Sequence, residues 1–481
     1  MQARSPICAL VVSFAFVAIS HADPVPTPVA PMADPTESPL PINLPTALHL
    51  AGVNPIDISL ASQRIQIANA QLERANLLWL PTVYIGTNYA RHDGQIQDIE
   101  GRVFTTSRSS FLIGGGPNLT FAVTDAIYAP LAARQIVLAR EFDAQATRND
   151  VMLMIAEAYF SVQQSRGELA GANDVVRRTE DVVNKAEKLA PGLIPQVETS
   201  RSRIELARRR QSVEVARDRW QSTSAELARL LRLNPSSVVE PAELPQMRVE
   251  LIDTNTPVDD LIPVGLTYRP ELAAHQAIVR ATLARLKQEK MRPLIPSILI
   301  RGNATNPSGT ISSGLFGGGR NDNVTNFGGR NSMDVQVLWE IQNLGLGNRA
   351  IVREREAESQ LATLELFRLQ DRIAAEVVAA HSQAKRAFVR AQQAELALRE
   401  SVDATNRIVQ AMGQTKRVGE SQTLIFRPLE VVAMIQTLAQ TYDDYYRAIA
   451  DANRGQFRLY RALGHPAHGL TQIQPVTEPP K

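Results

Sequence analysis

Residues 269–303 read RPELAAHQAIVRATLARLKQEKMRPLIPSILIRGN, and an earlier version of this sequence stands at residues 54–88, NPIDISLASQRIQIANAQLERANLLWLPTVYIGTN. Pro270 and Pro296 each lie 215 residues after a proline of the earlier version. In both copies apolar residues at helical spacing follow the first proline, and alternating residues follow the second. Each copy therefore predicts an amphipathic helix that ends at a proline and leads directly into a short strand.

The same offset of 215 residues continues beyond this stretch. Arg140-Glu141 corresponds to Arg355-Glu356, and Gln145 corresponds to Gln360. A register kept over so many residues indicates an internal duplication. We therefore expect two tandem halves, each with a long α-helical hairpin and two strands, in a chain that is mainly α.

The composition is typical of long helices that pack side by side. The chain has 481 residues and a formal net charge of +2, so no general attraction to nucleic acid is expected. Aromatic residues make up 5%, which is low for a protein built around a large globular core. Ala, Arg, Glu, Gln and Leu fill the long segments instead.

The first 22 residues have the features of a cleaved secretory signal peptide. Arg4 precedes an apolar run, and small residues lead to a cleavage site after Ala22. The single cysteine, Cys8, lies within this segment, so we expect a mature protein without thiols or disulfides. No other stretch offers the roughly 18 consecutive apolar residues of a transmembrane helix. A membrane-spanning part would therefore have to be a closed β-barrel.

Four short segments alternate apolar with polar or small residues, at 82–89, 118–124, 297–303 and 333–339. One apolar and one polar face suit a barrel with lipid outside and water inside, and they also suit a soluble sheet. At the 215-residue offset the apolar positions of the second strand in each half disagree. We therefore expect that one strand is shifted in register by one residue or carries a bulge.

A long helical stretch follows each pair of strands. No proline occurs between Pro130 and Pro191, and the counterpart at 349–412 contains neither proline nor glycine. Roughly 60 residues would make a rod of about 90 Å, because each helical residue rises about 1.5 Å. Turns at 191–195 and 418–428 predict helices that return antiparallel to these rods.

Prolines and changes of pattern set the expected boundaries along the chain. They give a signal peptide at 1–22, a proline-rich flexible leader at 23–45, a first repeat at 46–234, a linker at 235–263, a second repeat at 264–464 and a flexible tail at 465–481.

In the order of its motifs the chain resembles the outer-membrane efflux protein family, the TolC-like outer membrane factors. The resemblance covers about residues 44–464 and rests on the duplication and on 266–272 (LTYRPEL), 339–349 (WEIQNLGLGNR) and 458–464 (RLYRALG). It implies a homotrimer in which each chain gives four transmembrane strands to one β-barrel in outer-membrane lipid. The helices would form a hollow α-barrel across the periplasm.

The resemblance also implies a function and partners. A passive channel of a tripartite system would take solutes from an inner-membrane pump, through a periplasmic adaptor, to the outside of the cell. Multidrug efflux and type I secretion are the expected processes, and the cargo is left open because the pump selects it.

The hairpin tips are the adaptor contacts that the resemblance implies, at Gly192-Leu193 and Val418-Gly419. Glu198 fits the family's spacing after the first tip, whereas about five residues around 423–427 are inserted before Glu430. Ordinary helix-hairpin chemistry is the alternative for both turns.

Glu430 is the candidate for a constriction of the pore. Channels of this family are narrowed near their tips by rings of acidic side chains, and Glu430 matches one such position, whereas the next expected carboxylate falls on Ala433. The alternative is a solvated glutamate that the dipole favours at the start of a helix.

Two further sets of residues are candidates by position. Links between helices that hold the gate shut are expected from Tyr442, Asp443, Asp444, Tyr446 and Arg447. Ordinary pairs on one helix surface are the alternative for them. An interfacial aromatic belt is expected from Tyr84, Tyr89, Phe121 and Trp339.

The sequence does not favour catalysis or a bound cofactor. The mature histidines lack a metal-binding spacing such as HExxH, and 317–320 (GGGR) lacks the Lys-Ser/Thr of a phosphate loop. A nucleophile elbow and a dinucleotide fingerprint are also missing. The remaining rival to a channel is a non-conducting periplasmic trimeric coiled-coil scaffold, against which the four alternating strands argue.

Overall fold

A computed structural model describes residues 39–53, 55–190, 193–301, 313–320, 323–418 and 421–464. The expected signal peptide and tail, and the tip residues Gly192 and Gly419, lie outside these ranges. All described residues belong to one unit, Pro39–Lys481.

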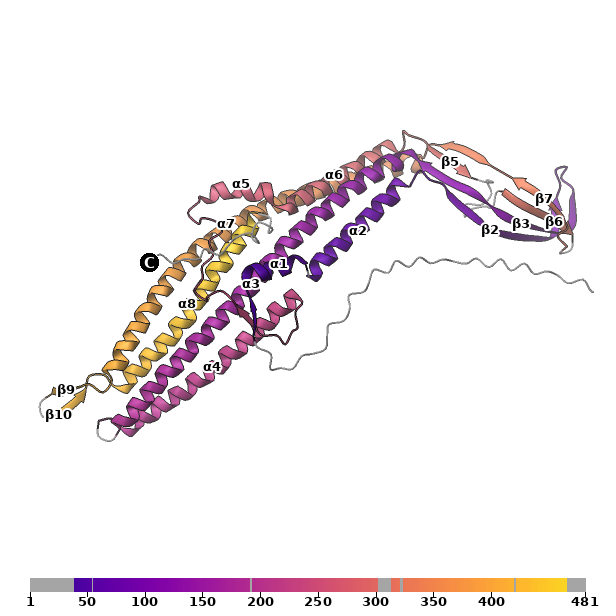
Figure 1. Cartoon of the computed structure of the whole chain (residues 1–481). Coiled ribbons are helices and arrows are strands. Elements are labelled where there is room, and N and C mark those ends of the chain that lie inside the picture. The colour runs from indigo at the N-terminus through magenta and orange to yellow at the C-terminus, as the bar shows by residue number, and fades with distance from the viewer. Residues whose placement is uncertain are drawn as a thin grey trace, which may run out of the picture. The chain divides into compact units, whose positions relative to one another are not determined.

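Two antiparallel helical hairpins make up most of this unit (Figure 1). The first consists of α3 (Val123–Leu189) and α4 (Gln196–Leu231), and the second of α7 (Leu346–Ala411) and α8 (Pro428–Ala462). At about 1.5 Å per residue, the 67 residues of α3 make a rod of about 100 Å. The predicted unbroken rods are confirmed. However, α3 starts before Pro130, which lies inside the helix.

Shorter helices lead into the strands of each half. These are α2 (Ile56–Asn76) and α6 (Pro270–Met291), as the two prolines predicted. α2 packs on α3, whereas α6 packs on both α3 and α7. The remaining helices are α1 (Leu44–Val53), α5 (Val258–Tyr268) and the short η1 (Gln342–Gly345). α5 begins within the expected linker.

The main sheet is antiparallel and contains the four predicted strand segments. They belong to β2 (Thr82–Gln97), β3 (Val103–Ala122), β5 (Ser297–Arg301) and β8 (Asp334–Leu338), together with β6 (Ser313–Arg320) and β7 (Asn326–Asn331). One edge of β3 pairs with β2, and its other edge pairs with β5 and β6. β8 then pairs with β5, and β7 pairs with β6. The hairpin β2–β3 thus lies beside the strands of the second half.

The register of the strands explains why the apolar positions of the two halves disagree. In the first half Thr82 pairs with Asn118, whereas Ser297, which corresponds to Thr82, pairs with Leu338. At the 215-residue offset Leu338 corresponds to Val123, so the pairing is shifted by five residues. An odd shift moves every side chain of a strand to the other face of the sheet. A shift in register was expected, but it amounts to five residues and not to the single residue predicted.

Because of this shift, apolar side chains of all four strands gather on one face, which we call the apolar face. Through the ladder pairs it contains Val83, Ile85, Tyr89, Phe111, Ile113, Leu119, Phe121, Ile298, Ile300, Leu315, Phe327, Val335 and Val337. Several of these side chains are exposed, including Ile85 (83%) and Val335 (56%). The opposite face, which we call the polar face, carries Asn88, Thr120 and Gln336, together with Leu112 and Leu299, which pair with Asn88 and Thr120.

Two small sheets lie outside the main one. β1 (Leu40–Ile42) pairs in parallel with β4 (Val239–Pro241), which brings the end of the expected leader onto the expected linker. The Tyr159 hydroxyl holds this contact, because it donates to Glu243 and lies 3.2 Å from the Ile42 carbonyl oxygen. β9 (Thr415–Val418) and β10 (Ser421–Leu424) form an antiparallel hairpin between α7 and α8.

A buried charge network ties the second half to α3. The Arg269 side chain, from the LTYRPEL motif, is 3% exposed and pairs with Glu271 and Glu376. Arg461 of α8 pairs with both carboxylates and with Asp150 of α3. The motif therefore joins α6, α7, α8 and α3.

None of the helices in the described ranges combines the length and the apolar character that crossing a membrane would require.

Candidate functional site

The candidate gate-link residues lie on α8, where it packs against α3. The Tyr442 hydroxyl donates a hydrogen bond of 3.1 Å to Asp174 Oδ2 of α3. Arg178 donates to the same carboxylate at 2.6 Å, and Arg177 pairs with its other oxygen at 2.8 Å. The Tyr442–Asp174 bond therefore links the two helical hairpins.

The pKa values of this pair follow from burial and charge. Burial alone would raise the pKa of Asp174, but the hydrogen bond and charge of Arg178 outweigh it, so the pKa lies below its ordinary value. Burial and the Asp174 carboxylate raise the pKa of Tyr442 to about 12. At neutral pH the tyrosine is therefore a neutral donor to a charged acceptor, which is the stronger kind of hydrogen bond.

Two glycines of α3 make room for the tyrosine rings of α8. A Cβ atom at Gly167 would lie 2.4 Å from the Tyr446 ring, and one at Gly171 would lie 2.8 Å from the Tyr442 ring. The two rings are stacked with their centroids 6.3 Å apart and their planes inclined by 8°. Only glycine at both positions lets the helices approach this closely, and we call this contact the glycine–tyrosine joint.

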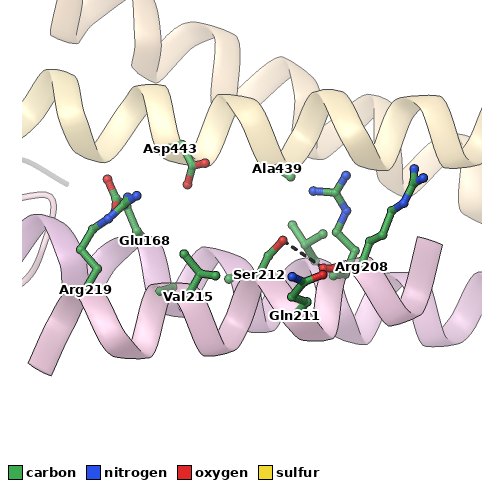
Figure 2. Close-up of a pocket in the computed structure, with 12 residues that line it drawn as sticks. Glu168, Arg208, Gln211, Ser212, Val215, Arg219, Ala439 and Asp443 are labelled. Atoms are coloured by element: carbon green, nitrogen blue, oxygen red, sulfur yellow. Dashed lines mark hydrogen bonds and ion pairs between the residues drawn. The ribbon is translucent and has the colours of Figure 1, made fainter. Parts of the chain in front are cut away.

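A cavity of about 460 Å³ lies beside this joint, between α3, α4 and α8. Figure 2 shows Asp443 and Ala439 reaching from α8 toward side chains of the first hairpin. Glu168, which is 2% exposed, accepts hydrogen bonds from Arg219 at 2.6 Å and from Gln164 at 2.7 Å. Burial, followed by the charge of Glu168, raises the pKa of Asp443.

A second polar contact joins α8 to α4. Glu205 of α4, which is 3% exposed, accepts a hydrogen bond of 3.0 Å from Gln436 of α8. Arg209 donates to the other oxygen of the same carboxylate at 2.7 Å. The buried carboxylates Glu168 and Glu205 are thus both satisfied by guanidinium and amide donors.

The other two candidates for gate links lie on the exposed side of α8. Asp444 accepts a hydrogen bond of 3.0 Å from Gln440, one turn earlier in the same helix. Arg447 is exposed and has no ion pair with any residue of the described ranges. The structure therefore places Tyr442, Asp443 and Tyr446 at the contact between hairpins, and Asp444 and Arg447 outside it.

Glu430 and Glu198 occupy the same position, the third residue of the returning helix, in the two hairpins. Glu198 pairs with Arg201 at 3.3 Å, and its side chain is 19% exposed. Glu430 is exposed and makes no ion pair within the described part of the chain. Its role as a constriction remains a prediction, since an exposed glutamate in a first helical turn fits both interpretations.

The two tips differ in length. Leu193, which is 42% exposed, lies in the short turn between α3 and α4. In the second hairpin Val418 ends β9, and only the first two of the inserted residues, Thr423 and Leu424, belong to β10. The insertion expected from the sequence therefore begins at the end of a β-hairpin that the described residues of the first tip lack.

The candidate belt aromatics divide between the two faces of the sheet. Tyr89 and Phe121 lie on the apolar face, whereas Tyr84 pairs with Gly116 on the polar face. Trp339 follows the end of β8 and is 59% exposed. Two aromatics not singled out from the sequence, Phe111 and Phe327, share a row with Tyr89 across the sheet.

Sequence reasoning missed the partners of α8, namely Gly167, Glu168, Gly171, Asp174 and Arg219. One signal could have found the glycines. They stand four residues apart in a helix of 67 residues that has no other glycine. Glycine at that spacing forms a small patch on one side of a helix.

Comparisons with known proteins rest on structure. The chain matches no protein-family model and none of the curated proteins. It is similar to the outer-membrane channel OprN, with 17% identity and a TM-score of 0.69 over 88% of this chain and 89% of that one. It is also similar to the outer-membrane protein VceC of Vibrio cholerae, with 15% identity and a TM-score of 0.66 over 88% of this chain and 96% of VceC.

A third structure, the open state of the MtrE outer-membrane channel of Neisseria gonorrhoeae, has 14% identity and a TM-score of 0.67. The matched part is 88% of this chain and 89% of MtrE. Each of these similarities extends over 88% of this chain. The chain therefore has the fold of the TolC-like outer-membrane efflux channels.

Proposed function

We propose that three copies of this chain form a channel across the outer membrane. The exposed apolar face of the sheet, opposite a polar face, is the observation that carries the proposal. In the described part of the sheet, β2 and β8 each have a neighbouring strand along one edge and none along the other. A free edge is not tolerated in lipid, so neighbouring copies would have to pair with these edges and close a barrel.

The height of the apolar face supports this arrangement. Phe111 and Phe121 mark its two aromatic ends on β3. Ten residues at about 3.3 Å each give about 33 Å along the strand, or about 25 Å once the strand is tilted by about 40°. That height matches the apolar band of outer-membrane barrels.

Exposed apolar side chains on the helices support the trimer. Leu361, Leu364 and Phe367 of α7 are 58%, 64% and 53% exposed in the single chain. Ile56, Leu60 and Ile67 of α2 are exposed to a similar extent. Such surfaces are typical of contacts with other subunits. In a trimer these helices would surround a hollow that continues the bore of the barrel.

The channel would be passive and would make or break no bond. An inner-membrane pump would supply the energy, and a periplasmic adaptor would contact the hairpin tips, including Leu193 and Val418. Leu193 of the first tip and Thr415-Lys416 beside the second are exposed, and the resemblance in sequence assigns the adaptor to this end. The Tyr442–Asp174 bond would hold the second hairpin against the first while the channel is closed.

Conductance in planar bilayers tests the channel. We expect the purified mature protein to give discrete, cation-preferring steps. Glu430→Ala should reduce the cation preference, because its unpaired carboxylate would be repeated three times around the bore. Glu198→Ala is the matched control, since Arg201 already balances the charge of Glu198.

The contrary outcomes separate this proposal from a scaffold. A trimer that inserts into membranes and gives steps unaffected by Glu430→Ala would remove Glu430 from the constriction. A protein that stays soluble without detergent and never inserts would remove the channel. The non-conducting periplasmic scaffold would then explain the helical hairpins.

A further inference from the structure

Three basic residues form one row across the sheet, near the end farthest from the helices along the strands. His92 of β2 pairs directly with Arg108 of β3, and Arg108 pairs directly with Arg320 of β6. Directly paired residues of an antiparallel ladder point to the same side of the sheet. We call His92, Arg108 and Arg320 the basic row.

The basic row lies on the polar face. Arg108 is three residues from Phe111, and successive residues of a strand point to opposite faces, so Arg108 and Phe111 point to opposite sides. Phe111 belongs to the apolar face. In the proposed channel the apolar face contacts lipid, and the basic row therefore faces the bore.

No carboxylate in the described part of the chain forms an ion pair with the basic row, although the charge of His92 acts on its neighbour Asp93. The three side chains of the row are exposed. The neighbouring carboxylate Asp93 lies on the other face, where Arg91 and Ser107 bind it. Near the turn between β2 and β3, Glu100 is paired with Arg102. Like charges opposite each other in a ladder destabilise it, and a bound anion would relieve this repulsion.

We propose that the basic row binds anions at the outer end of the bore. The guanidinium group presents a planar set of N–H donors that matches phosphate and carboxylate groups, so the expected ligands are solutes that carry these groups. Three copies of the row in the trimer would surround the path. This inference rests on the proposed function, because a single open sheet would not enclose a path.

Block of the conductance by tripolyphosphate tests the inference. The anion is added to the side of the bilayer that the β2–β3 turn faces. We expect it to reduce the wild-type conductance, and we expect the double variant Arg108→Gln/Arg320→Gln to need at least about tenfold more anion for the same block. Arg108→Lys/Arg320→Lys should keep most of the block, because the charge remains.

Arg102→Gln is the matched control, since it removes a nearby arginine that is paired and lies outside the row. It should leave the block unchanged. Equal block of wild type and the Gln double variant would overturn the inference, and so would a wild type that tripolyphosphate does not block. A wild type without any conductance steps would instead overturn the proposed function.

Phosphate groups of lipids are the other source of this chemistry, and a separate measurement distinguishes them. Binding to vesicles with and without phosphatidylglycerol is compared for wild type and the Gln double variant. We expect no difference between the two proteins. Loss of vesicle binding with an unchanged block would overturn the inference and assign the basic row to lipid headgroups.

Discussion

The two long helices α3 and α7 occupy corresponding places in the two halves, yet they present different surfaces. α3 carries Gly167 and Gly171, which receive the tyrosines of α8. At the 215-residue offset α7 carries Ser382 and Arg386, which are exposed. Duplication of the elements therefore did not duplicate their contacts. Within the described residues the glycine–tyrosine joint is formed on α3, and the corresponding positions of α7 remain exposed.

The tips of the two hairpins show a second difference. A short turn follows α3, whereas the β9–β10 hairpin follows α7. β9 and β10 pair with each other, and among the described residues neither strand pairs with another part of the chain. This difference affects the surface offered to a partner, while the joint affects how the hairpins hold together.

Filling the glycine–tyrosine joint should have the largest effect. Gly167→Leu would place side-chain atoms where the Tyr446 ring lies, and overpacking of this kind costs about 1–3 kcal/mol or more. We expect a loss of at least about 2 kcal/mol in urea unfolding of the detergent-solubilised protein. Gly52→Leu on α1 is the control, because nothing lies within 4 Å of that site. Equal effects of both changes would mean that Gly167 of α3 is no more closely packed than the open site at Gly52 of α1.

The carboxylates beside the joint should respond in opposite directions. The folded pKa of Asp174 is lowered, so its charge stabilises the fold above the unfolded pKa of about 3.9, and this contribution is lost as the pH falls through the folded value. Asp174→Asn should therefore cost about 1 kcal/mol at pH 7 and less at lower pH. The folded pKa of Asp443 is raised, so Asp443→Asn should add up to about 1 kcal/mol at pH 7.

Unfolding free energies measured from pH 7 downward test this pair of variants. The advantage of Asp443→Asn should shrink as the pH falls through the raised pKa of Asp443, because the wild type then binds a proton. If both variants changed the unfolding free energy in the same direction, the two assignments would be contradicted. These are the hydrogen-bonded, stabilising charge of Asp174 and the destabilising buried charge of Asp443.

Shortening the second tip should have the smallest effect on stability. Thr415 and Leu424 are directly paired, so Asn-Gly can replace residues 416–423 as a two-residue turn. We expect a change within about 0.5 kcal/mol and an unchanged conductance, since β9 and β10 pair with each other. A loss above about 1 kcal/mol would show that the β hairpin supports the helices below it.

Much of the fold could be predicted because local signals mark it. Pro55 and Pro270 mark the starts of α2 and α6, and long stretches without proline predict the two rods. The strands were found by their alternation, although β2 and β3 extend farther than the alternating segments. β9 and β10 were missed because their residues have no apolar alternation and were interpreted as a longer turn.

For each contact of the candidate gate-link residues with α3, the sequence predicted the residue on α8 but not its partner on α3. Tyr442, Asp443 and Tyr446 were found from their positions on the last helix, but Asp174 and Glu168 were not. The Tyr442–Asp174 bond joins residues that lie 268 positions apart, and no local pattern specifies such a pairing. Asp444 and Arg447 were equally good candidates by sequence, and only their place on the exposed side of α8 separates them.

By itself the sequence determined the duplication, the helical hairpins and the four strand segments, because proline, glycine and hydrophobic periodicity act over a few residues. The tertiary structure alone decided the five-residue shift that gathers the apolar side chains on one face, the joint between α3 and α8, and the basic row. Each of these depends on which residues meet across distant elements. Such pairings are set by how whole faces pack, since a change of one residue in register moves every side chain to the other side.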